Sequence, residues 1–154
     1  MNSKSMLLFG MPNSGKSTIA YGMVQRRVRN ALVIDGDKHR EMQFLGEQLT
    51  FSKADIMRNT QHVVKLARFA QDQGFHVLIA QIAPYVAQRE LMAQKLDNFT
   101  AVYCECDKSA RARRDNFVNS DLLFEVGTPD VIVNTEILTI EECVESCLGL
   151  WGFV

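Results

Sequence analysis

One stretch near the N-terminus decides the fold of this 154-residue chain: residues 10–18, Gly10-Met11-Pro12-Asn13-Ser14-Gly15-Lys16-Ser17-Thr18. The stretch matches the pattern G-x-x-x-x-G-K-[ST] of the phosphate loop, also called the Walker A motif. It follows a short apolar run at residues 6–9 and opens a stretch with helical periodicity. This is the strand–loop–helix context that the motif requires. The sequence therefore predicts a site for a nucleoside triphosphate.

Each residue type that the loop pattern requires has a chemical role in binding a nucleoside triphosphate. The two glycines let successive backbone N–H groups turn inward toward phosphate oxygens, and the helix that follows adds its positive dipole end. Lys16 can reach the β- and γ-phosphates, and the hydroxyl of Ser17 can coordinate Mg²⁺. We therefore expect ATP and Mg²⁺ to bind at Gly10, Asn13, Ser14, Gly15, Lys16, Ser17 and Thr18.

The rest of the chain alternates between short apolar runs and longer amphipathic stretches. Residues 6–9, 31–34, 76–82, 101–106 and 131–133 are predicted strands, and 17–29, 53–73, 86–95, 109–116 and 140–150 are predicted helices. The strands are apolar throughout, which is typical of a parallel sheet buried on both faces. The pattern predicts an α/β fold, the P-loop NTPase type with a five-stranded parallel sheet. Without a linker or repeat, residues 1–154 form one predicted domain.

Composition narrows the function further. With 47% hydrophobic residues and a net charge of −1, the chain is neither disordered nor a general polyanion binder. No apolar run approaches the ~20 residues of a membrane span. With no secretion signal at residues 1–17, a cytoplasmic location is expected. All 17 Lys and Arg lie in residues 1–114, whereas residues 115–154 hold eight acids. Either the last helix has a solvated acidic face, or the basic part holds an anionic ligand.

The second predicted strand runs directly into Asp35-Gly36-Asp37, with Arg40 close behind. Carboxylates at the carboxyl end of a parallel strand point into the crevice where α/β sheets bind ligands. Asp35 is therefore a candidate to accept a proton from an attacking hydroxyl or to hold Mg²⁺, and Arg40 a candidate to bind an anion. The alternative is a simple turn, because Asp-Gly-Asp is favourable turn chemistry.

Further short motifs follow in a fixed order. They are Phe51-Ser52 with Asp55 and Asn59, Ile82-Ala83-Pro84-Tyr85 with Arg89-Glu90, Arg114-Asp115, Pro129-Asp130-Val131-Ile132-Val133-Asn134-Thr135, and Ile140-Glu141-Glu142-Cys143-Val144. With the phosphate loop and the Asp-Gly-Asp segment, they make nearly the whole chain resemble the adenylylsulfate kinase family. These small P-loop kinases transfer a phosphate from ATP to the ribose 3′-hydroxyl of adenylylsulfate.

The resemblance implies roles for particular residues. Asp35 falls where the family acts on the reacting hydroxyl and Mg²⁺, and Phe51 where it stacks on the acceptor base. Asp37, Arg40, Phe51, Asn59, Ile82 and Pro84 are the implied acceptor-binding residues. The implied partner is a small nucleotide-like molecule.

The chain also departs from the family pattern in its acceptor half. Ile56 stands where the family has an arginine that contacts the phosphosulfate, and Arg58, two residues on, should face away. Gln61 and His62 replace an arginine pair, and the wall Ala83-Pro84-Tyr85-Val86 lacks the usual serine and arginine. The Lys-rich lid is cut down to residues 116–128, which hold neither Lys nor Arg. We therefore expect a nucleotide acceptor with a less anionic or different end group, such as cytidine diphosphoramidate, which some family relatives phosphorylate.

Two segments complete the candidate list. Residues 108–115 are the densest basic stretch, and small P-loop kinases often use arginines here on the transferring phosphoryl group. Arg111 and Arg114, three residues apart, are predicted to share a helix face and to contact ATP. The apolar end at residues 148–154 is expected either to pack on the sheet or to form a homodimer contact.

These observations favour a small-molecule kinase in which Lys16, Asp35 and Arg114 are catalytic. A nucleotide-binding switch without an acceptor is one alternative. A polynucleotide 5′-kinase is another, but the acidic last 40 residues argue against a nucleic-acid partner.

Overall fold

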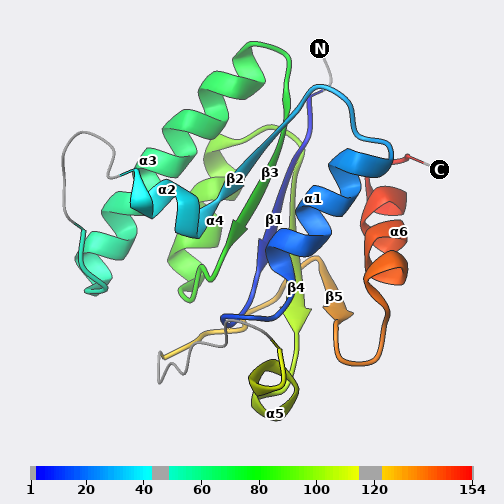
Figure 1. Cartoon of the computed structure of the whole chain (residues 1–154). Coiled ribbons are helices and arrows are strands. Elements are labelled where there is room, and N and C mark those ends of the chain that lie inside the picture. Colours follow the sequence, from blue (N-terminus) through cyan, green and yellow to red (C-terminus); the bar gives the residue numbers. More distant parts are fainter. Residues whose placement is uncertain (1–2, 43–48, 115–122, 154) are drawn as a thin grey trace.

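Five parallel strands form one sheet in the order β2-β3-β1-β4-β5 (Figure 1). The computed structural model describes residues 3–42, 49–114 and 123–153. The strands are β1 (Ser5–Phe9), β2 (Ala31–Asp35), β3 (His76–Gln81), β4 (Phe99–Glu105) and β5 (Val131–Asn134). The predicted α/β fold with a five-stranded parallel sheet is confirmed.

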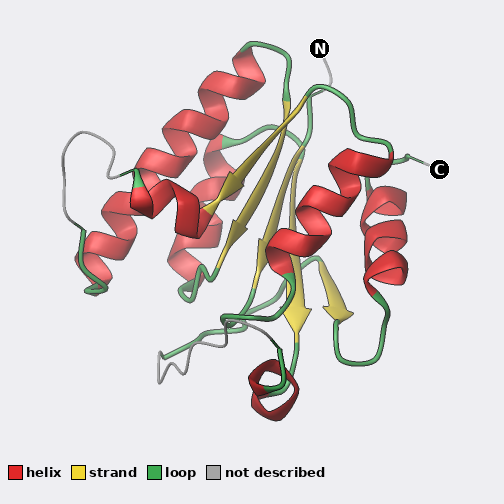
Figure 2. Cartoon of the chain, in the orientation of Figure 1, coloured by secondary structure: helices red, strands yellow, loops and turns green. Residues whose placement is uncertain are grey.

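Helices cover both faces of this sheet (Figure 2). On one side lie α1 (Lys16–Arg26) and α6 (Ile140–Leu150), and on the other α3 (Lys53–Asp72) and α4 (Val86–Lys95). Two short helices, α2 (Gly36–Glu41) and α5 (Lys108–Ala112), follow the carboxyl ends of β2 and β4. All of the strands end at the same edge, so the segments that follow them meet there.

The central strand β1 shows why the apolar runs are continuous. Met6 and Leu8 pack into the core on the α1–α6 side, whereas Leu7 and Phe9 pack into the core on the α3–α4 side. All four are fully buried. Because successive side chains of a strand point to opposite faces, a strand covered on both sides must be apolar at every position.

Two helices end several residues before their predicted bounds. Helix α1 ends at Arg26 rather than at residue 29, because Val28 turns into the core and Asn30 takes a left-handed backbone conformation (φ 54°). Helix α5 ends at Ala112, so Arg114 lies beyond the helix whose face it was predicted to share with Arg111. Residues 115 and 116, also predicted as helix, lie outside the described residues.

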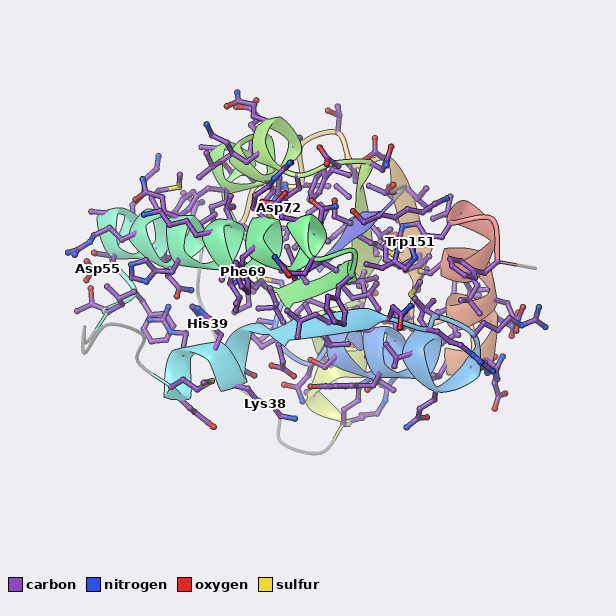
Figure 3. All side chains as sticks on the ribbon, turned by 90° about the horizontal axis from the view of Figure 1, so that it is seen from above. Lys38, His39, Asp55, Phe69, Asp72 and Trp151 are labelled. Atoms are coloured by element: carbon purple, nitrogen blue, oxygen red, sulfur yellow. The ribbon has the colours of Figure 1, made fainter. Side chains whose placement is uncertain are left out.

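The long helix α3 has a clear signal at each end. The Ser52 side chain accepts from the backbone N–H of Asp55 at the start. Past the end, Gly74 (φ 90°) and Phe75 return hydrogen bonds to the carbonyls of Gln71 and Ala70. Figure 3 shows the helix along its length, from Asp55 to Asp72. Neither α3 nor any other helix of the described residues has the length and hydropathy of a membrane span.

The apolar C-terminal end packs on the fold. Leu148 and Trp151 are buried in the core on the α1–α6 side, and the ring of Trp151 lies 5.6 Å from that of His76. Lys4 Nζ donates to the Trp151 carbonyl at 2.7 Å. The first of the two expectations for this segment is therefore confirmed, and the homodimer contact stays a prediction.

Candidate active site

The phosphate loop joins β1 to α1 at the carboxyl edge of the sheet, and both of its glycines are required by geometry. Gly10 has φ 153°, and a Cβ there would lie 2.6 Å from the Cys104 carbonyl oxygen. Gly15 has φ 95°, in the left-handed region that favours glycine. The loop therefore has the backbone conformation for which the two glycines were predicted.

Lys16 is folded across the mouth of this loop. Its Nζ donates to the carbonyls of Gly10 and Met11 at 3.0 and 2.8 Å, and to Ser14 Oγ at 3.4 Å. Burial lowers the pKa of Lys16 from 10.5 to about 8, although Asp37 and Asp35 nearby oppose the shift. The ammonium group is thus poorly solvated and is placed where an anionic ligand would be attracted.

Three residues from distant parts of the chain hold the outer side of the loop, and we call them the loop brace. Arg111 Nη1 donates to the Pro12 carbonyl at 3.1 Å, and Arg114 Nη1 donates to the Asn13 carbonyl at 2.7 Å. Thr135 Oγ1 donates to the Ser14 carbonyl at 2.8 Å, and Arg114 Nη2 also donates to the Thr135 carbonyl. Three consecutive loop carbonyls are therefore bonded from outside, which keeps them turned away from the inner face.

Asp35 lies opposite the loop and caps helix α2. Its Oδ1 accepts from the backbone N–H groups of Asp37 and Lys38 at 3.0 and 3.5 Å. The Asp-Gly-Asp segment is therefore the start of a helix, and the alternative of a simple turn is wrong. Both bonds reach Oδ1, and no described residue bonds to Oδ2, so that oxygen remains available for a ligand.

Arg40 and Phe51 form the other end of the site. The guanidinium of Arg40 lies 4.2 Å from the centre of the Phe51 ring, and its Nη2 donates to the carbonyls of Leu49 and Thr50, both at 3.0 Å. The Asp55 carboxylate accepts from the N–H and hydroxyl of Thr50, and these bonds lower the pKa of Asp55. Phe51 is 70% exposed although its loop is held from two sides.

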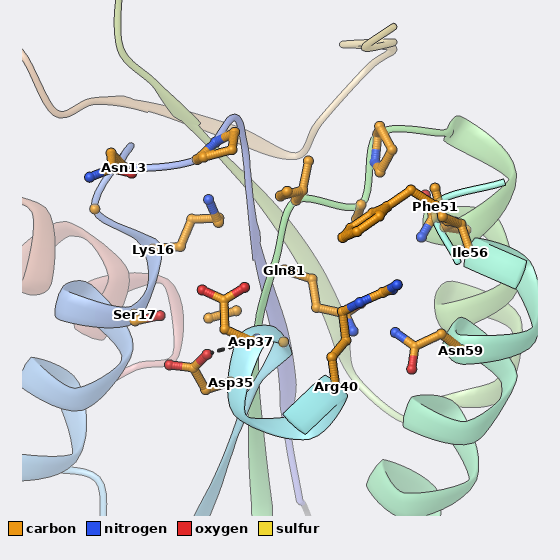
Figure 4. A pocket seen from close by; sticks show the side chains of 18 of the residues that line it. Asn13, Lys16, Ser17, Asp35, Asp37, Arg40, Phe51, Ile56, Asn59 and Gln81 are labelled. Atoms are coloured by element: carbon orange, nitrogen blue, oxygen red, sulfur yellow. Dashed lines mark hydrogen bonds between the residues drawn. The ribbon is translucent and has the colours of Figure 1, made fainter. Parts of the chain in front are cut away.

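These parts surround a single cavity of about 790 Å³ (Figure 4). Most of the predicted site residues line it: Asn13, Gly15, Lys16, Ser17, Thr18, Asp35, Asp37, Arg40, Phe51, Asn59, Ile82 and Pro84. Gly10, Ser14, Arg111 and Arg114 do not line it and lie in or behind the loop. The volume is within the range typical of small-molecule sites.

The face of α3 that borders the cavity carries Ile56 and Asn59. Both are buried, and Asn59 shares a side-chain hydrogen bond with His39 of α2. Burial, with His62 and Arg40 nearby, lowers the pKa of His39. Arg58 is exposed and does not line the cavity, as its position on the helix predicted. No basic side chain therefore enters the cavity at position 56.

Sequence reasoning missed several lining residues, above all Gln81 and Gln88. Gln81 ends β3, next to the predicted Ile82, and Gln88 lies on α4 and is bonded to Thr60 and to the backbone of Tyr85. Neither belongs to a recognisable motif. The one signal in the sequence was a polar residue at the carboxyl end of an apolar strand, the same signal that singled out Asp35.

The wall behind Ile82 is fixed by Arg89. Its guanidinium is buried and donates to the carbonyls of Ala83, Glu125 and Val126. Ala83 takes a left-handed conformation (φ 43°), and the Glu125 N–H donates to the Pro84 carbonyl at 2.8 Å. Residues 125 and 126 of the predicted lid are therefore bonded to the cavity wall, while residues 116–122, also predicted as lid, lie outside the described residues.

The oxygen donors near the loop suit Mg²⁺. The hydroxyl of Ser17 and the carboxylates of Asp35 and Asp37 line the same part of the cavity. Among the described residues, no group of three or more His, Cys, Asp or Glu could hold a metal ion by itself. This pattern fits Mg²⁺, which usually takes one or two carboxylates and completes its shell with water and substrate phosphates.

Comparison with known proteins places this site in context. The family model for adenylylsulphate kinase matches residues 2–118. An adenylyl-sulfate kinase of Geotalea daltonii is 30% identical, over 91% of this chain and 78% of that protein. A cytidine diphosphoramidate kinase of Campylobacter jejuni is 26% identical, over 90% of both chains.

Solved structures with the same fold include an APS kinase of Mycobacterium tuberculosis in complex with AMPPNP and APS. It superposes with a TM-score of 0.84 and 24% identity, over 98% of both chains. A gluconokinase of Sinorhizobium meliloti superposes with a TM-score of 0.74 and 16% identity, over 98% of this chain and 93% of that chain. At these identities the likeness concerns the fold.

Proposed function

The chain belongs to the adenylylsulphate kinase family, and from this premise we propose that it transfers the γ-phosphate of ATP to the ribose 3′-hydroxyl of a nucleotide acceptor. As a member of this family, the chain is an ATP-dependent phosphotransferase that acts on a hydroxyl group. One observation carries the finer proposal: a single cavity joins the phosphate loop and Asp35 to the acceptor end around Phe51 and Asn59. The phosphate donor and the acceptor therefore have adjoining binding sites in one cavity.

The phosphate-loop side of the cavity is the proposed binding site for the phosphate donor, ATP, and it supplies positive charge and fixes the position of the triphosphate. In this proposal the triphosphate takes over Lys16 Nζ from the loop carbonyls, and backbone N–H groups of the loop hold its oxygens. Ser17, Asp35 and Asp37 would hold Mg²⁺, which when bound neutralises charge on the phosphates. Catalysis is then mainly positioning and charge stabilisation.

Asp35 is the proposed partner of the reacting hydroxyl. Its Oδ1 is held by the first turn of α2, so the side chain is fixed, and Oδ2 is left to orient the acceptor hydroxyl or to receive its proton. Asp37 is on the same turn and lines the same cavity. Asp35 therefore combines a fixed geometry with a free acceptor oxygen.

Arg111 and Arg114 act on the donor site through the loop. The Arg111 guanidinium donates to the carbonyls of Pro12 and Cys106. The Arg114 guanidinium donates to the carbonyls of Asn13 and Thr135. Both guanidinium groups add positive charge directly behind the triphosphate site. Direct contact of Arg114 with the transferring phosphoryl group, as the sequence suggested, remains a prediction.

The acceptor side favours a base stacked on Phe51 and an end group with little negative charge. Arg40 covers one face of the ring, so the other is available to a base. Ile56 stands where the family resemblance places an arginine, and each missing charge-assisted hydrogen bond would cost roughly 1.5–3 kcal/mol toward a doubly charged group. The cytidine diphosphoramidate kinase of Campylobacter jejuni, among the relatives, acts on such an acceptor by its name.

A screen for ADP release tests this proposal. Purified protein with MgATP is offered adenylylsulfate, cytidine diphosphoramidate and the corresponding uridine and inosine compounds, and product is identified by mass and by the position of the new phosphate. We expect turnover with at least one nucleotide, and phosphate on the ribose 3′-oxygen. Slow ATP hydrolysis that no acceptor stimulates would overturn the proposal and return the chain to the nucleotide-switch alternative.

The two alternatives are not favoured by the comparisons. The family match and the curated relatives are small-molecule kinases, and the structural likeness to a Pnkp1/Rnl/Hen1 complex, at 21% identity, concerns the fold. Adding a 5′-hydroxyl oligonucleotide to the screen provides the check, and we expect no turnover with it.

A further inference from the structure

Arg89 is a buried arginine that the proposed function does not use. It lies on α4, is only 7% exposed and is not among the residues that line the cavity. Among the residues that the structure describes, no carboxylate forms an ion pair with it. An arginine is almost never buried this deeply unless it is paired, because removing its charge from water is costly. Its position therefore calls for a reason beyond the packing of α4.

The guanidinium group of Arg89 joins three parts of the chain. Its Nη1 donates to the carbonyl of Ala83, in the cavity lining, at 2.7 Å. Its Nη2 donates to the carbonyls of Glu125 and Val126. The guanidinium carbon lies 4.2 Å from the centre of the Phe9 ring, at the end of β1 and directly before the phosphate loop. One side chain therefore contacts the cavity wall, the predicted lid and the strand that leads into the loop.

Two further hydrogen bonds join the same segments without Arg89. We call residues 125–127 the strap. The N–H of Glu125 donates to the Pro84 carbonyl at 2.8 Å, and Glu125 Oε1 accepts from the N–H of Val86 at 2.8 Å. Figure 1 shows this part of the chain at the carboxyl edge of the sheet, on its way to β5. The strap is therefore bonded to the cavity wall from both of its neighbours, the wall itself and the start of α4.

The backbone on both sides of this contact is left-handed. Ala83 has φ 43°, which is unfavourable for alanine and persists only where the surroundings impose it. Gly127 has φ 62°, and a Cβ there would lie 2.9 Å from Val86 Cγ2 and 3.1 Å from Arg89 Nη2. The residues on either side of Ala83 line the cavity. The shape of the cavity wall therefore depends on a backbone conformation that Arg89 helps to impose.

We propose that Arg89 is a positioning residue for the acceptor: by holding the strap against the cavity wall, it fixes Ile82 and Pro84 where the acceptor binds. The strap then belongs to the acceptor site although none of its three residues lines the cavity. This inference rests on the proposed function for the identity of the acceptor as a nucleotide. It does not rest on phosphoryl transfer, because a fixed wall already contributes to binding.

The test measures nucleotide binding in wild type, Arg89→Met and Arg89→Lys. The probes are AMP and CMP, titrated by calorimetry into the MgADP-loaded protein, and MgADP is titrated separately. In Arg89→Met, the affinity for the monophosphate that wild type binds more tightly should fall about 10-fold, because a preorganised wall is lost. The affinity for MgADP should change less than about twofold, because the loop brace still holds the phosphate loop. Arg89→Lys can satisfy one of the three carbonyls, and its loss should be intermediate.

Gly127→Ala tests the strap while Arg89 stays in place. The added Cβ would collide with Val86 and Arg89 and displace the strap from the wall. Gly127 is exposed, so the core is not altered. We expect the monophosphate affinity to fall as in Arg89→Met, again with little change in the affinity for MgADP. This variant also decides the question if Arg89→Met does not fold.

Arg68→Met is the matched control. It removes an arginine that bonds Asp72, Asp97 and the Lys95 carbonyl, outside the cavity lining. The melting temperature should fall, and the affinities for MgADP and for the monophosphates should stay at the wild-type level. A purely structural role predicts the same behaviour for Arg89→Met, a lower melting temperature with unchanged affinities.

The outcomes separate this inference from the proposed function. If monophosphate affinity is unchanged in Arg89→Met or Gly127→Ala, or falls no more than MgADP affinity does, the positioning role is overturned even though the enzyme turns over. Monophosphate binding that depends on Arg89, without phosphoryl transfer to any acceptor in the ADP-release screen, supports the positioning role and overturns the proposed function. If wild type loaded with MgADP binds neither AMP nor CMP, both are overturned.

Discussion

The phosphate-loop half of the cavity comes from one continuous stretch, residues 10–18, whereas the acceptor half takes its residues from β2, α2, α3, β3, α4 and the loops before α3 and after β3. In the loop half, the conformation is set by two glycines and by outside bonds to three consecutive carbonyls. In the acceptor half, the side chains come from several elements that are distant from one another in sequence. A half built from one motif has little freedom to change, while a half assembled from several elements can change one residue at a time.

Lys16→Ala is the change with the largest expected effect, because it removes the only charged side chain of the loop motif. Phosphoryl transfer should fall about 1,000-fold with every acceptor, as for the loss of one major electrostatic contact. The melting temperature should change little. Steady-state kinetics and thermal unfolding measure the two effects.

Lys65→Ala, an exposed lysine of α3, is the control and should keep full activity. If Lys16→Ala retained phosphoryl transfer, the phosphate-loop half of the cavity would not be responsible for catalysis.

Asp35→Asn tests the residue that joins the two halves. The amide keeps the cap of α2 but loses the negative charge, so kcat should fall about 100-fold, much more than the affinity for MgATP. Asp35→Ala, which also removes the cap, should cost about 1 kcal/mol more in the free energy of unfolding. Comparing kcat, nucleotide Kd and denaturant unfolding in the two variants separates the chemical role from the cap. An unchanged kcat in Asp35→Asn would exclude Asp35 as the partner of the hydroxyl.

Ile56→Arg tests whether the acceptor half can be changed independently. The new guanidinium would enter the cavity from α3 and raise kcat/KM for adenylylsulfate about 10-fold relative to cytidine diphosphoramidate, as one charge-assisted hydrogen bond should. The affinity for MgATP should stay the same. Met57→Arg adds the same charge one residue along, outside the cavity lining, and should leave the ratio of the two acceptors unchanged. If Ile56→Arg and Met57→Arg give the same ratio of kcat/KM for the two acceptors, the end group of the acceptor does not bind near position 56.

The smallest expected effect is the dependence of nucleotide affinity on pH. Lys16 has a pKa of about 8, so it is charged below that pH and loses its charge above it. A bound triphosphate favours the charged form and raises the pKa, so binding takes up a proton above pH 8 and affinity falls there, by at most about tenfold per pH unit. Calorimetric titration of MgADP between pH 7 and 9.5 measures this slope. Lys16→Arg keeps its charge and should flatten the slope, and a wild-type affinity that does not change with pH would contradict the predicted role of the buried ammonium.

The two halves also differ in how far the sequence predicts them. The loop, its strand and its helix follow from one motif, the family resemblance placed Ile56 at the acceptor site, and the period of α3 correctly placed Arg58 away from the cavity. Gln81 and Gln88 were missed because their roles depend on which strands and helices become neighbours in space. Arg111 and Arg114 were predicted to contact ATP, but their bonds to backbone carbonyls could not be foreseen, since such bonds have no side-chain pattern.

The loop brace links the nucleotide site to the end of the chain. Thr135 follows β5 directly, and its hydroxyl bonds a loop carbonyl 121 positions earlier. Any local opening that detaches β5 also releases one support of the loop, so opening and nucleotide binding are thermodynamically linked. A nucleotide bound at the loop should therefore slow amide hydrogen exchange in β5, which is joined to the loop through Thr135. Amide exchange near the C-terminal end of the chain becomes a reporter of occupancy at its N-terminal motif.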